Sequence, residues 1–559
     1  MKKKKNIVIP YTILYLASTQ STMSAILSAD DLNDFISPGV ACIKPLTEDN
    51  SKDENTTFNE NGEVEIQIDD QGNPLEISQI DGKQTNLSPA QISLSDCLAC
   101  SGCITSAEEV LVAQHSHQEL VNALENRGDR VFVASVSQQS RASLALAYNL
   151  SMDDIDKLLI NLFIHQMGFT YVVGTSLGRK LSLINEAQSL ITKKENKELN
   201  NGPVLSSICP GWVLYAEKTH PYVLPRISTV KSPQQITGCL LKSLTASSLQ
   251  IPKSKVYHVS IMPCFDKKLE SARPEIYDTS EESVPDVDCV LTAKELVTLI
   301  EEQSPKYLLL PEDKISSILQ INTPMSEIYQ RCAPPNWPFI EYSWSNDPGS
   351  ASGGYAYNYL KIFQENLLVK GGYDAEKFML QTINGRNPDI YELRLMYNGE
   401  KLASSAVVNG FRNIQNLVRK LKPTAGGKST VKSNPLAARR RARISTRDKS
   451  DTSEETADAS KVDYVEIMAC PNGCINGGGQ ISAPSTIAEK EWISEALSKY
   501  NQVPMFDLSL HPNDIEQFIL WSNLFEQENN ISNDRLFKTH FNAVEKPTDP
   551  AAILVGSKW

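Results

Sequence analysis

The sequence predicts an α/β protein with more than one lobe and with cysteines at the ends of several strands. Apolar, strand-like runs alternate with helical patterns from about residue 129 onward, and three of these runs end in a cysteine. At 559 residues the chain is too long for one core, since domains usually hold about 100–200 residues. Ligands of open α/β sheets gather outside the carboxyl ends of the strands. The cysteines are therefore the first candidates for a site.

The N-terminal part precedes the α/β pattern. Residues 1–22 have a Lys-rich start and a short apolar run, as in a secretory signal, and we interpret them as a signal-like or non-native extension because Met23 offers a second start. Residues 23–110 contain clustered cysteines and form a predicted N-terminal metal-binding segment. Within it, residues 48–88 are acidic and polar, with one alternating run, "EVEIQIDD", and are predicted to be an exposed insertion.

The α/β pattern itself falls into two predicted lobes, residues 111–315 and 316–421. The first contains "DRVFVASVS", "GFTYVVGTS", "GPVLSSICPGW" and "KVYHVSIMPC" as strand-like runs; in the second, "SGGYAYNYLKIF" opens a helix after a glycine pair. Residues 422–461 are almost free of apolar side chains and change from basic to acidic, which predicts a disordered surface loop. Residues 462–559 begin with "DYVEIMAC" and form a C-terminal segment.

Composition excludes several classes of function. A net charge of −13 argues against a nucleic-acid binder, which normally shows a basic face. Eleven cysteines, an odd number with several clustered, favour reduced thiols and metal binding over a disulfide framework. The sequence holds no transmembrane run, no P-loop and no histidine set with ligand spacing, and we assign no catalytic residue.

One cysteine group lies near the N-terminus. "DCLACSGC" gives Cys97, Cys100 and Cys103 the C-x2-C-x2-C spacing that places three thiolates on a [4Fe–4S] cluster. The fourth cysteine of a ferredoxin run is missing, so the fourth ligand must come from elsewhere, and Cys42 is the candidate. Zinc is the structural alternative, although it more often uses two C-x2-C pairs.

A second group comes from the α/β region. Cys209, Cys264 and Cys470 each end a strand-like run, and Cys474 follows in "ACPNGCINGGGQ". Four thiolates suit an iron–sulfur cluster, and glycines at 477–479 would let the backbone approach it and offer N–H donors. Spacing alone leaves this reading and a turn that happens to contain cysteines both open.

Several blocks in this order resemble the signature blocks of iron-only hydrogenases. They are "CPGWVLYAEKTHPYVLP", "KSPQQITG", "IMPCFDKKLESARPE", "SGGYA" and "VEIMACPNGCINGGGQ". The resemblance covers most of the chain from about Cys97 onward. It implies two α/β lobes around a buried [4Fe–4S] cluster held by Cys209, Cys264, Cys470 and Cys474, with a small N-terminal cluster-binding segment. Two [4Fe–4S] clusters are then the expected cofactors.

Departures from the hydrogenase pattern argue against hydrogenase chemistry. Hydrogenases carry a proton-relay cysteine directly before the first block ligand, whereas this chain has Ile208, which cannot ionise. Lys267 matches a lysine that contacts the di-iron ligands in hydrogenases, but it also reads as a solvated lysine at a helix start. The sequence therefore predicts a hydrogenase-like scaffold that is not an enzyme; an iron-only hydrogenase or an electron-transfer protein is the alternative.

The departures are shared by the eukaryotic hydrogenase-like group, the nuclear-architecture-related or prelamin-recognition-factor-like proteins. The blocks "LSDCLACSGCITSAEE" and "GFRNIQNLVRKLK" are similar to that group. The resemblance implies a role in cytosolic and nuclear iron–sulfur protein assembly, between scaffold NTPases and a targeting complex that includes a WD-repeat protein and delivers [4Fe–4S] clusters to apoproteins. It implies a cytoplasmic location and allows a nuclear one. The terminal Trp559 is a candidate anchor for a partner.

Overall fold

The computed structural model describes three strands near the N-terminus and most of the chain after residue 114. The described residues are 64–68, 74–78, 84–86, 115–274, 284–311, 315–319, 323–423 and 456–544. Two compact units are distinguished, Met1–Gln91 and Ile92–Trp559. The first unit contains an antiparallel sheet of β1 (Val64–Ile68), β2 (Pro74–Ser78) and β3 (Gln84–Asn86). Its first strand is the alternating run predicted in the acidic insertion.

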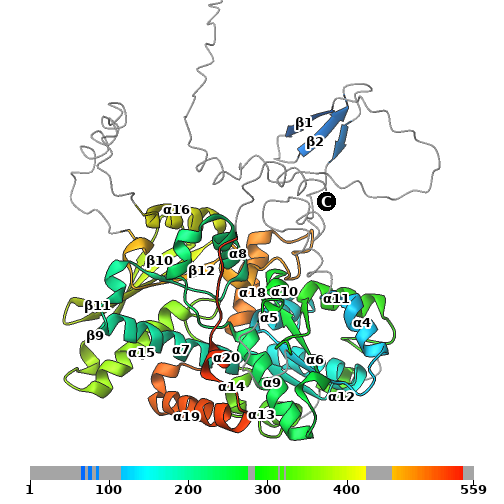
Figure 1. The fold of residues 1–559 in the computed structure, drawn as a ribbon. Helices are drawn as coiled ribbons and strands as arrows, with labels where there is room; N and C mark the ends of the chain where they lie inside the picture. Colours follow the sequence, from blue (N-terminus) through cyan, green and yellow to red (C-terminus); the bar gives the residue numbers. More distant parts are fainter. Residues whose placement is uncertain are drawn as a thin grey trace, which may run out of the picture. The chain divides into compact units, whose positions relative to one another are not determined.

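The second unit contains a parallel four-stranded sheet in the order β5-β4-β7-β8, in the part of the molecule where Figure 1 labels α5 (Gln138–Ala147) and α6 (Met152–Ile160). Its strands are β4 (Val131–Val136), β5 (Tyr171–Gly174), β7 (Val256–Met262) and β8 (Cys289–Thr292). The sheet is buried on both faces, as parallel sheets usually are. Side chains of β4 alternate between two apolar clusters: Val133 lies with α7 (Ser176–Glu195) and α9 (Pro233–Leu249), and Phe132 lies with α6 (Met152–Ile160).

The other large sheet is mixed and has the order β6-β12-β11-β10-β9. Its strands are β6 (Val204–Leu205), β9 (Phe378–Asn384), β10 (Ile390–Tyr397), β11 (Glu400–Asn409) and β12 (Tyr464–Met468). β6, β12 and β11 run parallel, and β11, β10 and β9 run antiparallel. Helix α15 (Tyr355–Lys370) begins after the predicted glycine pair, with Gly354 at a φ of 70°, and shares an apolar cluster with this sheet.

The sheets do not follow the lobes expected from composition. β6 was expected to extend the first lobe, but it pairs with β12, which lies beyond the long polar stretch at 422–461. A two-residue strand has too few side chains for its own pattern to specify a partner. This pairing places the chain before Cys209 beside the chain before Cys470.

The remaining elements cover the sheets and connect them. The helices are α4 (His117–Glu125), α5 (Gln138–Ala147), α8 (Pro210–Thr219), α10 (Asp266–Ser271), α11 (Ala293–Glu302), α12 (Ile315–Leu319), α13 (Met325–Cys332), α14 (Ile340–Ser343), α16 (Phe411–Leu421), α18 (Glu489–Asn501), α19 (Pro512–Asn529) and α20 (Asn533–Phe537). Short 3-10 or π turns are η2 (Asn161–Gln166), η3 (Glu198–Asn201), η4 (Pro221–Arg226), η5 (Lys253–Lys255), η6 (Ala375–Lys377), η7 (Ala459–Lys461), η8 (Gly473–Asn476) and η9 (Leu508–Leu510). No helix in the described part of the chain is both long and apolar enough to cross a lipid bilayer.

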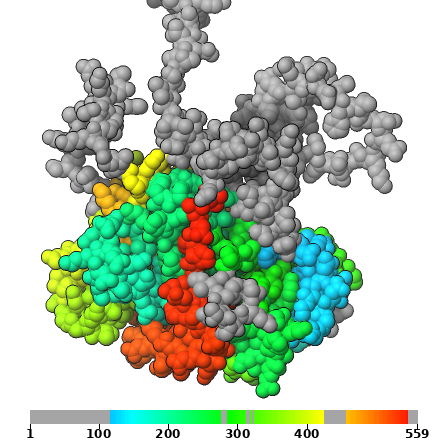
Figure 2. Space-filling model, in the orientation of Figure 1, coloured from blue at the N-terminus to red at the C-terminus, as the bar shows by residue number. Residues whose placement is uncertain are grey.

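After α20 the chain continues as an extended segment, residues 538–544, which we call the C-terminal strap. It starts with an antiparallel bridge between Val230 and Lys538, and the Thr539 N–H donates to the Thr229 carbonyl at 2.8 Å. The strap then runs along the surface towards α8, where it is the narrow red band of Figure 2. It therefore joins the end of the described chain to the helix that follows Cys209.

Candidate metal centre

Four cysteines lie where elements of the two large sheets end. Cys209 is the N-cap residue of α8, Cys264 follows β7, Cys470 follows β12, and Cys474 lies in η8. Because β6 and β12 are parallel neighbours, their carboxyl ends point the same way. The fold thus accounts for Cys209 and Cys470 lying at one edge of the mixed sheet, with β7 of the other sheet supplying Cys264.

The four thiols approach one another closely enough to interact electrostatically. Burial raises the pKa of Cys264 well above its ordinary value, and the negative charges of Asp266 and of the other three cysteines raise it further. Burial raises the pKa of Cys209 to about 12, with Cys474 adding to the effect. Thiols with raised pKa values stay protonated at neutral pH unless a bound cation stabilises the thiolate form. The arrangement therefore favours a buried positive ligand.

The thiols are also held by neighbouring backbone and side chains. The Ala469 N–H donates to the Cys209 sulfur at 3.3 Å, and the Cys474 sulfur lies 3.6 Å from that of Met468. The Cys474 N–H donates to the Ser352 hydroxyl at 2.9 Å, which fixes η8 against the start of α15. The sulfurs of Cys209 and Cys474 are thus positioned by residues that lie within two positions of Cys470.

The glycines after Cys474 have different reasons to be glycine. A Cβ on Gly477 would lie 2.3 Å from the Pro263 carbonyl oxygen, and one on Gly479 would lie 2.3 Å from a methyl carbon of Thr292. A Cβ on Gly478 would meet nothing within 4 Å. Protein packing explains the outer two glycines, whereas Gly478 borders open space and its backbone hydrogen-bonds Cys470. Only this middle glycine fits the expected approach of bare backbone to a ligand.

The donor set fits a polynuclear cluster better than a single ion. No three His, Cys, Asp or Glu residues among those described converge as the ligands of one metal ion would. The ligands of one ion crowd around a single point, whereas a [4Fe–4S] cluster carries its four thiolates on separate corners. The four thiols interact without forming a single-ion site, and four thiolate donors are the ligands that a [4Fe–4S] cluster takes.

A saturated ion pair lies beside these cysteines. Lys267, three residues after Cys264, donates to the Ile208 carbonyl at 3.1 Å and to the two carboxylate oxygens of Glu270 at 3.0 and 2.9 Å. An ammonium group has three donors, so all three are used. The Lys267 side chain is 11 % exposed, and the solvated lysine considered for this position is therefore wrong. Burial opposes its charge, but the charge and hydrogen bonds of Glu270 outweigh that effect and raise the Lys267 pKa.

Glu270 was not predicted from the sequence, although it links a third segment to this pair. It accepts a hydrogen bond from the Ser232 hydroxyl at 2.8 Å and one from the Gln234 amide at 3.3 Å. The available signal was the three-residue spacing of Lys267 and Glu270 at the start of a helix. Lys267 and Glu270 both lie in the block "IMPCFDKKLESARPE", which resembles a signature block of iron-only hydrogenases.

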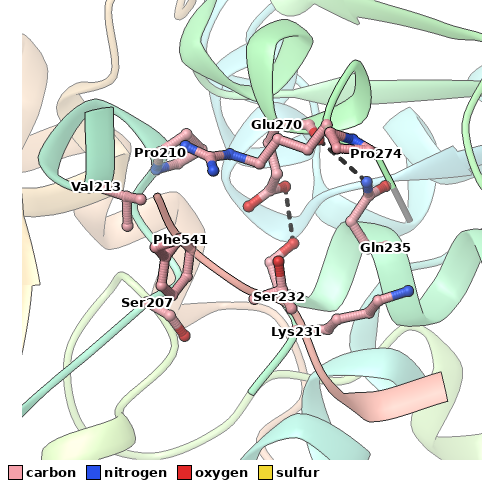
Figure 3. Close-up of a pocket in the computed structure, with 11 residues that line it drawn as sticks. Ser207, Pro210, Val213, Lys231, Ser232, Gln235, Glu270, Pro274 and Phe541 are labelled. Carbon is pink, nitrogen blue, oxygen red and sulfur yellow. Dashed lines mark hydrogen bonds between the residues drawn. The ribbon is translucent and has the colours of Figure 1, made fainter. Parts of the chain in front are cut away.

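Next to the pair is a small cavity, partly open to solvent, that offers about 20 Å³ to the centres of water molecules (Figure 3). Ser207 and Pro210, on either side of Ile208 and Cys209, form one wall. Ser232, Gln235 and Glu270 form another, and Thr539 and Phe541 of the C-terminal strap complete the lining. Two of the residues that line this cavity, Ser207 and Pro210, lie within two positions of the candidate ligand Cys209.

The other predicted positions divide into two groups. Cys42, Cys97, Cys100, Cys103, Trp559, Met23 and the arginine run at 439–443 lie outside the described residues. Cys239, Cys289 and Cys332 are buried at 3 %, 0 % and 6 % exposure and belong to the apolar core. None of these three lies among the four cysteines of the candidate centre.

One protein family matches a domain of this chain, and several known proteins match it over nearly its full length. The family described as "Iron only hydrogenase large subunit, C-terminal domain" matches residues 130–478. A relative from Scheffersomyces stipitis named cytosolic Fe-S cluster assembly factor NAR1 is 66 % identical over 550 residues, covering 96 % of this chain and 100 % of the relative. The relative of the same name from Saccharomyces cerevisiae is 39 % identical over 488 residues, covering 85 % and 90 %.

Solved structures agree on the fold. A variant of the [FeFe]-hydrogenase HydA1 from Chlamydomonas reinhardtii matches with a TM-score of 0.53 and 20 % identity, over 77 % of this chain and 99 % of that one. HydA(deltaEFG), from a study of stepwise H-cluster assembly, matches with a TM-score of 0.51 and 21 % identity, covering 77 % and 99 %. The fold and site thus define a hydrogenase-like protein. The chain belongs to the iron-only hydrogenase large-subunit family and, within it, to the group of the cytosolic Fe–S cluster assembly factors.

Proposed function

We propose that this protein acts in cytosolic iron–sulfur protein assembly and helps to transfer [4Fe–4S] clusters to apoproteins. The observation that carries the proposal is the convergence of four thiols, one buried and three partly buried, in a hydrogenase fold whose adjoining lysine is already saturated. The names of full-length relatives support the same role.

In this proposal the chain holds two clusters. Cys209, Cys264, Cys470 and Cys474 bind an inner [4Fe–4S] cluster, and their position at the ends of elements from both large sheets favours a structural or poised site. Cys97, Cys100 and Cys103, with Cys42 from a distant position, bind an outer cluster in the segment 23–110. A bound cluster supplies an electron store or a cargo, and the fourth ligand so far away in sequence makes the outer cluster the more exchangeable one.

The protein is proposed not to be a hydrogenase. Ile208 has an aliphatic side chain that cannot pass a proton, and its carbonyl already accepts from Lys267. Glu270 takes the other two Lys267 donors, so this lysine has none left for the ligands of a di-iron group. Lys267 therefore has no hydrogen-bond donor left for such a group, and the side chain of Ile208 can neither bind it nor transfer a proton to it.

The proposed partners are the scaffold NTPases, a targeting complex with a WD-repeat protein, and apo iron–sulfur clients. Trp559, with its free carboxylate, is the proposed docking element for the targeting complex. Direct nucleic-acid binding is not proposed, since the net charge is −13. The proposed location is cytoplasmic, with the nucleus as a further site of action.

Anaerobic purification of the full chain tests the function. We expect iron and sulfide for two clusters, no carbonyl or cyanide stretching bands in the infrared, and transfer of iron and sulfide to an apo client. Bands in that region would reopen the hydrogenase alternative. Two clusters that exchange electrons but never leave the protein would favour the electron-transfer alternative instead.

The variant Ile208→Cys refines this test, with Ile155→Cys in α6 as a control in the buried core away from the four cysteines. We expect neither variant to evolve hydrogen, because Lys267 stays saturated when only residue 208 changes. Hydrogen evolution by Ile208→Cys alone would show that the missing thiol was the single obstacle to hydrogenase chemistry.

A further inference from the structure

The C-terminal strap is anchored at Glu217, a residue of α8. The Glu217 carboxylate accepts a hydrogen bond from the Asn542 N–H at 3.1 Å, and the Glu217 carbonyl accepts one from the Val544 N–H at 3.0 Å. Arg273 donates to both carboxylate oxygens, at 3.0 and 2.5 Å. With Glu217 only 8 % exposed, these charge-assisted bonds are sheltered from water. The far end of the strap is therefore fixed as firmly as its start.

The anchor links the two helices that lead away from candidate ligands. α8 starts directly after Cys209 and carries Glu217 two turns further on. α10 starts two residues after Cys264, and Arg273 follows its last turn. The Glu217–Arg273 pair therefore joins the helix after one thiol to the helix after another, and the strap is bonded to this junction.

Phe541 of the strap covers one side of the cavity beside Cys209. The Arg273 guanidinium lies 5.5 Å from the centre of the Phe541 ring, which is half-buried against the apolar core. In Figure 3 the ring stands beside Val213 and Ser207, at the cavity wall opposite Glu270. Residues on both sides of Cys209 line the same cavity. Thr539 and Phe541 of the strap therefore close one side of a cavity that lies beside the chain around Cys209.

We infer that the C-terminal strap positions and covers the Cys209 side of the metal centre, with Phe541 as the cover and Glu217–Arg273 as its clamp. Phe541, Glu217 and Arg273 act through Cys209 and are positioning residues. The importance of this role for cluster retention rests on the proposed function. The covering itself concerns the thiol and can be measured without a cluster.

The test is alkylation of the iron-free, full-length chain by iodoacetamide, followed by mass spectrometry at Cys209 and at Cys289. Cys289 is fully buried in β8 and serves as the internal reference for general unfolding. Phe541→Ala should raise the Cys209 rate about tenfold, the factor expected when roughly half of an aromatic burial is lost. Phe541→Leu keeps an apolar cover and should stay within about twofold of wild type.

Val544→Ala is the matched control, because this strap side chain is 52 % exposed and should have no effect. Arg273→Gln is a second variant that opens the clamp and removes the guanidinium from beside the ring while leaving Phe541 itself in place, and it should act in the same direction as Phe541→Ala. An unchanged Cys209 rate in both variants would overturn the inference. So would a parallel rise at Cys209 and Cys289 in both, since that reports unfolding rather than uncovering.

Iron loading separates this inference from the proposed function. In the loaded protein, 2,2′-bipyridine should remove iron faster from Phe541→Ala than from Val544→Ala. A wild-type chain that binds no iron through Cys209 would defeat the proposed ligand assignment, while the alkylation result would still decide the role of the strap.

Discussion

Lys267 donates to the main-chain carbonyl of Ile208 at 3.1 Å and so joins the residue before one candidate ligand to the segment after another. Glu270 completes the set of partners on Lys267 and adds Ser232 and Gln234 to the network. The space beside the cysteines is thus organised by the chain's own charges. Removing one of them should be more harmful than removing both.

Lys267→Met should destabilise the protein by about 3–5 kcal/mol, because it leaves the Glu270 carboxylate buried without its cation. The double variant Lys267→Met, Glu270→Gln removes the stranded charge and should recover most of that loss. Denaturant unfolding of wild type, the two single variants and the double variant measures the coupling. Additive effects would contradict the idea that the pair acts as a unit.

Gly479→Ala should destabilise the fold by about 1–3 kcal/mol, since its Cβ would lie 2.3 Å from a methyl carbon of Thr292. Gly478→Ala is the matched control and should change the unfolding free energy of the iron-free chain by less than about 0.5 kcal/mol, because no atom lies within 4 Å. The two variants differ by one position in a glycine run. Equal losses would mean that backbone freedom, rather than packing, is what the run requires.

Glu186→Gln should flatten the pH dependence of stability. Burial raises the pKa of Glu186 to about 7, although the Ser228 hydroxyl donates to the carboxylate at 2.5 Å. Between about pH 4.5 and 7 the folded state then holds a proton that the unfolded state has lost, so stability falls as the pH rises and the full cost is present above pH 7. The variant should gain about 3 kcal/mol over wild type at pH 8.

The thermal midpoint at pH 5 and at pH 8 tests this expectation. The two proteins should differ much less at pH 5, where Glu186 is largely protonated in the folded state. Glu198→Gln changes an exposed carboxylate on η3 and should leave the profile of the wild type unaltered. A Glu186→Gln profile parallel to that of the wild type would rule out this residue as the source.

Cysteine variants distinguish the two proposed clusters. Cys97→Ala or Cys100→Ala should remove iron while the thermal midpoint stays near that of the wild type. Cys264→Ala or Cys470→Ala should lower the midpoint as well, because a buried metal site contributes folding free energy. Cys289→Ala removes a core thiol outside both sets and should leave the iron content unchanged. Both classes losing iron alike while staying folded would contradict the inner and outer assignment.

Local patterns were sufficient for much of the fold. Runs such as 256–262 and 464–468 are mostly apolar and end two residues before a cysteine, so the strands and the candidate ligands could be predicted together. The partner of β6 could not, because Val204 and Leu205 carry no information about a strand that lies beyond a long polar stretch. Sheet order depends on contacts distant in sequence, which periodicity does not report.

The site was predictable in the same uneven way. Cys209, Cys264 and Cys470 stand out as thiols at strand ends, but the saturation of Lys267 depends on a main-chain carbonyl brought close by folding. The pair of Glu217 and Arg273 has no local signal at all, since the two residues meet only through the packing of α8 and α10. Charge in the sequence identifies ionisable groups without identifying their partners.

The parallel pairing of β11 and β12 gives the molecule a natural point for attaching a reporter. The chain leaves α16 at Leu421 and returns through η7 to the start of β12 at Tyr464, while the cysteines follow the opposite end of that strand. Five residues of strand, about 16 Å, separate the two ends. The described chain on both sides of residues 424–455 lies at the end of β12 away from the cysteines, so a fluorophore or a small folded tag introduced there should leave the iron content of the protein unchanged.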